Sequence, residues 1–223
     1  LSRAVNQKFF SDSRYGYAEG GHLGYYELGV YVGRRLIFLK PDVLIAVDEF
    51  YANAFHTYRQ FFHWGETGKL SQGDGAVHWR GQSAGAQLRF VSSAPLTTAI
   101  RAGRISRHYN HAAGNEVLET AIEGDGFTSV FSVLTLDPVG AEEAVTVEKL
   151  PVMSNFKGIQ FQDREIEALR VCKDGRSWVV VVAHQEYATP TDTFHAGGCT
   201  GFGGVAVFDE TAGEREIGTV LAR

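Results

Sequence analysis

Short apolar runs separated by glycine-containing turns recur along almost the whole chain. The clearest pairs of runs are 76–80 with 86–92, 117–122 with 128–136, 165–171 with 177–184, and 204–209 with 215–221. Turn signals such as Gly124-Asp125-Gly126 and Lys173-Asp174-Gly175 lie between them, as expected for β-hairpins. No segment of about 12 residues keeps the 3.6-residue period of an amphipathic helix. The pattern predicts an all-β protein, a large antiparallel β-sandwich that is layered, or supersandwich-like, with little helix.

The stretch 34–64, RRLIFLKPDVLIAVDEFYANAFHTYRQFFHW, contains the most informative of these patterns. Two apolar runs flank Pro41-Asp42, which predicts a hairpin. With a two-residue loop, Arg35 faces Asp48 and Arg34 faces Glu49, and opposite charges across an antiparallel pair stabilise it. A longer loop shifts this pairing by one residue, because proline suits type I or II turns better than the mirror-image turns of the tightest hairpins. We interpret the four charges as structural pairs.

The chain of 223 residues is long enough for one large β domain, and we expect a single sandwich spanning 1–223. Residues 1–30 differ from the rest, and we expect an irregular N-terminal segment rich in glycine and aromatic residues, with 11–26 as a surface loop. The chain starts at Leu1 and its one methionine is Met153, so we expect a piece of a larger protein. Cys172 and Cys199 fit either one disulfide or two separate thiols.

Net charge and hydropathy exclude two classes of partner. A net charge of −5 provides no general basic field for phosphate and argues against a nucleic-acid partner. No apolar run approaches the roughly 20 residues of a membrane-spanning helix. An acidic polysaccharide remains compatible with this composition, provided that a local basic cleft exists.

Aromatic residues and histidines are the candidates for ligand binding. His22, Tyr25 and Tyr26 lie together in the early segment, and Trp64 ends the stretch described above. Aromatic rings offer an apolar face with a polar edge, so these four residues are candidates for binding a sugar, the alternative being a packed corner between sheets.

The remaining histidines raise a metal hypothesis that the spacing does not favour. His56 and His63 follow Asp48, but no His-x-His or His-x-x-x-His pair is present, and a buried structural histidine is the favoured interpretation. His108 and His111 are three residues apart, a spacing that splits them between the two faces of a strand. We assign no metal ligand and no catalytic residue.

In these features the chain resembles the C-terminal β region of the heparinase II/III-like polysaccharide lyases. An aromatic loop leads into Arg-Arg, an apolar run and Lys-Pro-Asp, then into an apolar run ending at Asp48 and a Tyr-x-x-x-Phe-His string at 58–63. A Ser-x-x-Tyr segment at 106–109 and strands at 117–122 and 128–136 follow in the same order. The resemblance covers roughly residues 15–140.

The resemblance implies a parent enzyme with an upstream helical toroid and a downstream β-sandwich. Such lyases cleave uronic-acid-containing polysaccharides by β-elimination, so an acidic polysaccharide and the toroid are the implied partners, and a periplasmic or secreted location is implied for the parent. The family's His-x-His element has no counterpart here, so any divalent metal belongs upstream and we expect no cofactor in this segment. The favoured interpretation is therefore a supporting β domain that is inactive alone. The alternative is an autonomous carbohydrate-binding module, with Tyr25, Tyr26, Trp64 or Trp79 stacking on sugar.

Overall fold

The computed structural model describes residues 4–138, 141, 143–185 and 192–222. It divides the chain into two compact units, 1–142 and 143–223, and each is described by itself. Both consist of β-strands, which confirms the predicted all-β class, and the one short helix among the described residues is the 3₁₀ turn η1 (Tyr26–Leu28). The single domain spanning 1–223 stays a prediction. Within the described residues, no helix is long and apolar enough to cross a membrane.

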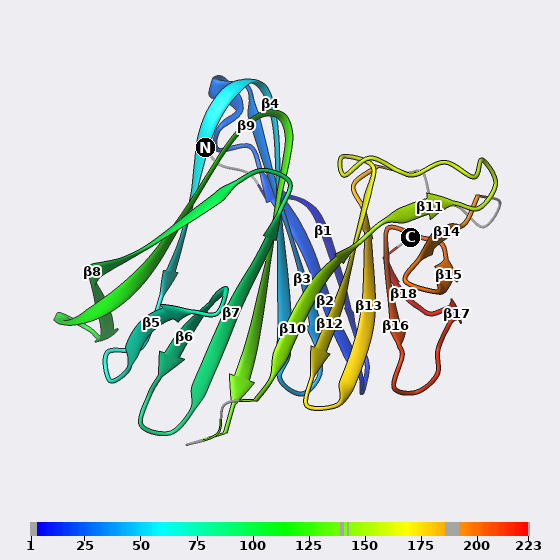
Figure 1. Ribbon diagram of the computed structural model, residues 1–223. Coiled ribbons are helices and arrows are strands. Elements are labelled where there is room, and N and C mark those ends of the chain that lie inside the picture. Colours follow the sequence, from blue (N-terminus) through cyan, green and yellow to red (C-terminus); the bar gives the residue numbers. More distant parts are fainter. Residues whose placement is uncertain (1–3, 139–140, 142, 186–191, 223) are drawn as a thin grey trace. The chain divides into compact units, whose positions relative to one another are not determined.

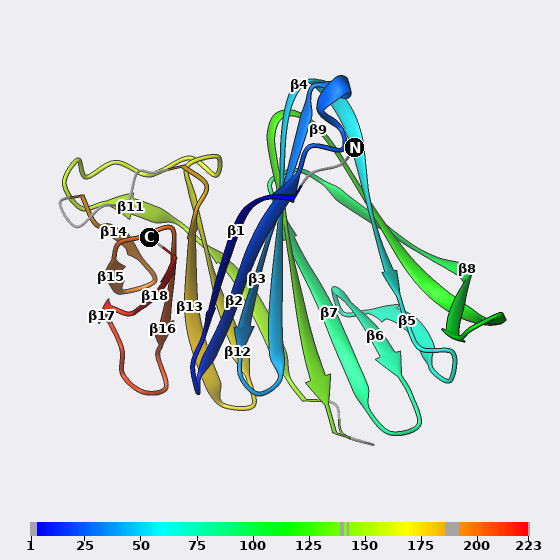
Figure 2. The same ribbon diagram turned by 180° about the vertical axis from the view of Figure 1, so that it is seen from behind.

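The first unit is one nine-stranded sheet (Figure 1). Its strands are β1 (Ala4–Ser11), β2 (Tyr15–His22), β3 (Val30–Leu39), β4 (Val43–His63), β5 (Lys69–Gly73), β6 (Ala76–Arg80), β7 (Gly85–Ser92), β8 (Leu96–His108) and β9 (His111–Asp137). They are ordered β1-β2-β3-β4-β9-β7-β6-β5, and β8 also pairs with β9. Figure 2 shows β1, β2 and β3 side by side in the same order from the other side.

Strands β4 and β9 are the centre of this sheet because they pair with each other along nearly their whole length. Both strands arch over at the same place (Figure 1). There Ala52 pairs with Gly126 and His56 pairs with Gly124, so β4 has two more residues than β9 between these pairs. Two extra residues in β4 preserve the alternation of its faces, whereas one extra residue would reverse it. Side chains with even numbers on both sides of the arch therefore share one face, as the stacked rings of Phe50 and Tyr58 demonstrate.

The hairpin predicted at 124–126 is wrong, because β9 continues through these residues without reversing. Gly126 has a φ of +63°, a conformation that favours glycine, and it lies opposite Ala52 where the two strands arch. The turn signal therefore marks a bend within one strand. The prediction of a surface loop at 11–26 is also wrong, since β2 occupies the middle of this segment and buries Tyr15 and Tyr17 on alternate positions. The glycines of this segment interrupt the alternation of apolar and polar residues that would have indicated a strand.

The predicted hairpin of β3 and β4 is confirmed, but its predicted register is wrong by one residue. Residues 40–42 form a three-residue connection, so Leu39 faces Val43. Arg34 consequently lies opposite Asp48, and Arg35 lies opposite Val47 instead of Asp48. Arg35 pairs diagonally with Glu49, with Nε to Oε1 at 3.3 Å. The four charges are still two ion pairs, with the partners exchanged.

The second unit contains two sheets that enclose a core of their own. One sheet has the order β10 (Val145–Leu150), β12 (Ile166–Lys173), β13 (Arg176–Ala183), β16 (Val205–Asp209) and β18 (Thr219–Ala222), and the other β11 (Val152–Ser154), β14 (Phe194–Ala196), β15 (Cys199–Gly201) and β17 (Glu216–Ile217). Residues of both sheets meet in one buried cluster, in which the rings of Phe194 and Phe208 make an edge contact at 6.2 Å between centroids. Cys172 and Cys199 are free thiols in this unit.

The β12–β13 turn predicted at 173–175 is confirmed, with φ of +49° at Asp174 and +72° at Gly175. A Cβ at Gly175 would contact nothing within 4 Å, so only the backbone opposes a side chain there. We expect Gly175→Ala to lower the free energy of unfolding by about 1 kcal/mol, because alanine is strained at positive φ. Gly73→Ala is the matched control, since Gly73 also has open space around it and is not in the left-handed region. Equal midpoints of urea unfolding for both variants would contradict this expectation.

Candidate functional site

A cavity of about 820 Å³ in the first unit is lined by even-numbered side chains of β3 and β4, and also by Thr57, Arg59 and Phe61. It is lined by residues of β2, η1, β3 and β4, and by Tyr25 beside η1. The sequence brings these elements together because β2, β3 and β4 are consecutive antiparallel neighbours. The arch of β4 then places both halves of that strand along the same cavity.

The structure brings together two of the four residues that the sequence predicted for sugar binding. His22 and Tyr25 both line the cavity, with ring centroids 5.3 Å apart. Tyr26 is 74% exposed in the neighbouring turn and is not a lining residue. Trp64 follows the end of β4, stacks on Trp79 at 5.8 Å between ring centroids, and is not a lining residue either.

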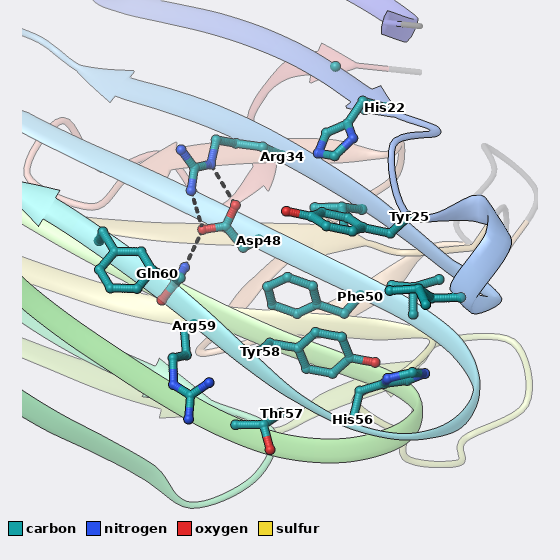
Figure 3. A pocket seen from close by; sticks show the side chains of 16 residues that line it. His22, Tyr25, Arg34, Asp48, Phe50, His56, Thr57, Tyr58, Arg59 and Gln60 are labelled. Atoms are coloured by element: carbon teal, nitrogen blue, oxygen red, sulfur yellow. Dashed lines mark hydrogen bonds and ion pairs between the residues drawn. The ribbon is translucent and has the colours of Figure 1, made fainter. Parts of the chain in front are cut away.

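A chain of hydrogen bonds crosses the floor of the cavity (Figure 3). Arg34 donates from Nε to Asp48 Oδ1 at 2.5 Å and from Nη2 to Oδ2 at 2.9 Å. Gln60 Nε2 donates to Asp48 Oδ2, and Thr120 Oγ1 of β9 donates to Gln60 Oε1 at 2.8 Å. The Asp48 carboxylate is only 2% exposed. The bidentate pair with Arg34 compensates its buried charge.

Aromatic rings form the other part of the cavity wall. Phe50 and Tyr58 stack with centroids 4.2 Å apart and planes 13° apart, and His56 lies 6.1 Å from the Tyr58 ring. Figure 3 shows Tyr25 beside this stack and His56 on the hydroxyl side of Tyr58. Burial, followed by the nearby charge of Asp125, raises the pKa of Tyr58, so its hydroxyl stays protonated at neutral pH.

The opposite face of the same strands carries a second polar cluster. Glu49 and Arg35 pair there, and Tyr17 donates to Glu19 at 2.5 Å. Burial, reinforced by the hydrogen bond to Glu19, raises the pKa of Tyr17 strongly. Burial and the charge of Glu49 likewise raise the pKa of Tyr51. Because neighbouring positions of a strand point to opposite faces, this cluster does not line the cavity.

The described residues contain no group of three or more His, Cys, Asp or Glu side chains placed to hold a metal ion. His108 and His111 pair across the turn between β8 and β9, far along the sequence from the cavity strands.

Phe50 and Gln60 are cavity residues that sequence reasoning did not select as candidates. The sequence did contain a signal for Gln60, because His56, Tyr58 and Gln60 occupy alternate positions and would share one face of a strand. The contribution of Phe50 depends on the two extra residues in the arch, and nothing in the sequence pattern reveals their number.

Comparison with solved structures finds similarity to polysaccharide lyases. The chain is similar to the heparan sulfate lyase HepC from Pedobacter heparinus, with a TM-score of 0.66 and 11% identity, over 84% of this chain and 29% of that one. Two structures of heparinase III give TM-scores of 0.65 and 0.61, at 11% and 12% identity, over 81% and 82% of this chain and 27% of each of theirs.

No family model matches the sequence, and no curated protein matches it either. The chain spans less than a third of the length of each lyase that it resembles. The resemblance predicted from the sequence is confirmed as one of fold: the chain is similar in structure to a β region of heparinase III.

Proposed function

We propose that the chain is the β domain of a heparinase II/III-like polysaccharide lyase, whose parent cleaves uronic-acid-containing polysaccharides by β-elimination. The domain supports the helical toroid of the parent and lines one wall of its substrate cleft. The observation that carries this proposal is the match of fold to HepC over 84% of the chain. The ordered agreement of short motifs along residues 15–140 supports the same assignment independently.

An apolar surface on the first unit supports the docking role. Phe9 is 80% exposed and Leu136 is 50% exposed, and with Phe38 and Leu44 they line an apolar hollow of about 460 Å³. Exposed apolar hollows of this kind mark interaction sites in folded proteins. We assign the toroid as the occupant, because each similar lyase contains a further region more than twice the size of the matched one.

The chemistry of β-elimination needs a base for the proton beside the uronate carboxyl group and a group that stabilises the resulting charge. We assign neither role to this chain, and residues 1–223 alone are expected to be inactive. The acidic polysaccharide is the proposed substrate of the parent.

The coding sequence that precedes the codon for Leu1 provides the direct test. A segment encoding a helical repeat and a His-x-His element is expected there, and the longer polypeptide is expected to release unsaturated, ultraviolet-absorbing products from heparan sulfate or alginate. Residues 1–223 incubated with the same substrates are the matched control, with no rise in absorbance expected. Absence of any upstream helical segment, or cleavage by residues 1–223 alone, would overturn the proposal.

An autonomous carbohydrate-binding module is the second candidate, favoured by the aromatic lining of the cavity. Its aromatic platform would be Tyr25 with Phe50 and Tyr58, since Trp64 and Trp79 are stacked on each other. Affinity electrophoresis separates the two functions. Strong retardation of residues 1–223 by a soluble polysaccharide favours the module, whereas unchanged mobility favours the supporting domain.

A further inference from the structure

We propose that the outer edge of β4 at residues 56–63 binds an extended, acidic segment of a partner protein, which adds to the sheet as a further strand. This goes beyond the proposed function, because the partner is a polypeptide and not a saccharide. The inference comes from the strand pairing, the cavity lining and the charges of the first unit.

Residues 56–63 of β4 have a partner strand on one side only. The pairing of β4 with β3 ends at Ala52, whereas its pairing with β9 resumes at His56 and continues to His63. Within the described part of the chain, the other edge of this segment is therefore open. Sheets commonly protect such edges with lysine or proline, and this segment contains neither.

The backbone groups on the open edge belong to alternate residues. Trp64 N donates to Glu116 O at 3.2 Å, so these two residues form a hydrogen-bonded pair of the β4–β9 ladder. Such pairs recur at every second position of an antiparallel ladder, so the backbone groups of the even-numbered residues are directed to β9. The outward N–H and C=O groups are those of Thr57, Arg59, Phe61 and His63. They repeat at about 7 Å, the two-residue spacing at which a further strand offers its own groups.

The cavity described above borders this open edge. Every residue from His56 to Phe61 lines it. One face of a strand contributes only alternate residues, so an unbroken run means that the edge itself faces the cavity. Figure 3 shows Thr57 and Arg59 on one side of the strand and Tyr58 and Gln60 on the other. The cavity thus provides space for a further extended chain beside β4.

The charges beside the edge favour an acidic segment. Arg34 and Asp48 compensate each other in their bidentate pair. Arg59 and Arg101 share the carboxylate of Glu119, with Arg59 Nε 3.2 Å from Glu119 Oε1, so one positive charge stays in excess. The Arg59 side chain is 55% exposed, and an acidic side chain directly opposite it on an added strand would form a favourable cross-strand pair.

Two neighbouring residues define the rest of the preference. Thr57 Oγ1 donates to Glu123 Oε1 at 3.3 Å, so the charge of Glu123 disfavours an acidic side chain at the arch end of the edge. Phe61 is 56% exposed, and a β-branched side chain opposite it would pack on its ring. The segment that fits best therefore carries one acidic residue flanked by β-branched residues.

Hydrogen exchange of ¹⁵N-labelled residues 1–223, followed by NMR, tests the inference. The probe is the peptide Thr-Val-Thr-Glu-Thr-Val-Thr with blocked termini. In the free protein, the outward amides of Thr57, Arg59 and Phe61 should exchange at least about tenfold faster than those of Tyr58 and Gln60. The peptide should slow the first set and leave the second unchanged. The same peptide N-methylated at every residue has no backbone N–H group and should have no effect.

Three variants separate backbone pairing from charge. Phe61→Pro removes one outward N–H and should weaken peptide binding about tenfold, while the free variant stays folded because the pairing with β9 does not use that N–H. Phe61→Ala keeps the N–H and should weaken binding by less than about threefold. Arg59→Met should remove a roughly threefold preference for the glutamate peptide over its lysine counterpart, a preference that falls as salt is raised.

The outcomes separate this inference from the proposed function. Equal exchange of odd- and even-numbered amides along 56–63, or exchange unchanged by the peptide, overturns it. Slow exchange of the outward amides in a free protein that sediments as a dimer assigns the edge to a second copy and also overturns it. Tighter binding of a heparan sulfate tetrasaccharide than of the peptide at Arg59 assigns the cavity to a saccharide, with the same consequence. None of these results bears on whether a helical lyase domain precedes Leu1, which is tested separately.

Discussion

Replacing Arg34 with methionine is expected to lower the free energy of unfolding by about 3 kcal/mol. The change leaves the Asp48 carboxylate, 2% exposed, without its bidentate partner, and a buried charge deprived of its partner is strongly destabilising. Gln60 still donates to Asp48, but a neutral amide compensates only part of the charge. Urea unfolding at neutral pH, followed by circular dichroism, measures the loss.

Arg59→Met is the matched control for this expectation. The side chains of Arg34 and Arg59 are 53% and 55% exposed, but Glu119, the partner of Arg59, keeps a second arginine, Arg101. The control should therefore lose less than about 1 kcal/mol. The double variant Arg34→Met with Asp48→Asn should regain part of the stability, because the uncompensated charge is gone. Equal losses from Arg34→Met and Arg59→Met would show that burial of Asp48 is not what makes the pair important.

The second large effect is expected at Glu210 in the second unit. Its carboxylate accepts from Arg170 Nε at 2.9 Å, from Ser177 Oγ at 2.6 Å and from Arg215 Nη1. Burial by itself raises the pKa of Glu210, but these hydrogen bonds and the charge of Arg170 outweigh it and lower the pKa to about 2. We expect Glu210→Gln to lower the free energy of unfolding at pH 7 by about 2 to 3 kcal/mol.

The pH dependence of this effect has a defined direction. Because the folded pKa lies below the ordinary 4.5, the stabilisation is complete above about pH 4.5 and is lost as the pH falls towards 2. Glu210→Gln should therefore flatten the stability profile across that range. Glu148→Gln is the control, since Glu148 also contacts Arg170, at 3.4 Å, but its side chain is 64% exposed. A Glu210→Gln profile as steep as that of the original protein would rule out this group as the source.

Local chemistry made the fold class and several turns predictable. Asp174-Gly175 determines its own turn, because both residues adopt positive φ readily, and the prediction was confirmed. The 27-residue strand β9 was not predictable, because glycine signals at 124–126 favour a turn equally well as a bend. Which of the two forms depends on β4 pairing across the whole length, and that is a property of the tertiary structure.

The candidate site was predictable only where it depended on a single segment. His22 and Tyr25 are three residues apart and meet as expected. Asp48 was recognised as half of an ion pair, but its partner depended on a loop of three residues instead of two. Phe50 and Tyr58 are eight residues apart and lie on opposite sides of the arch, so their stacking requires knowledge of the arch itself.

The arch in β4 also constrains how this chain can change its length in evolution. Residues 53–55 lie where β4 and β9 lose register, and Tyr58 and Gln60 follow them on the cavity face. Insertion or deletion of one residue there would turn both side chains to the other face, whereas a change of two would preserve them. Homologues that retain the cavity should therefore differ in this bend by even numbers of residues, and an odd difference should coincide with its loss.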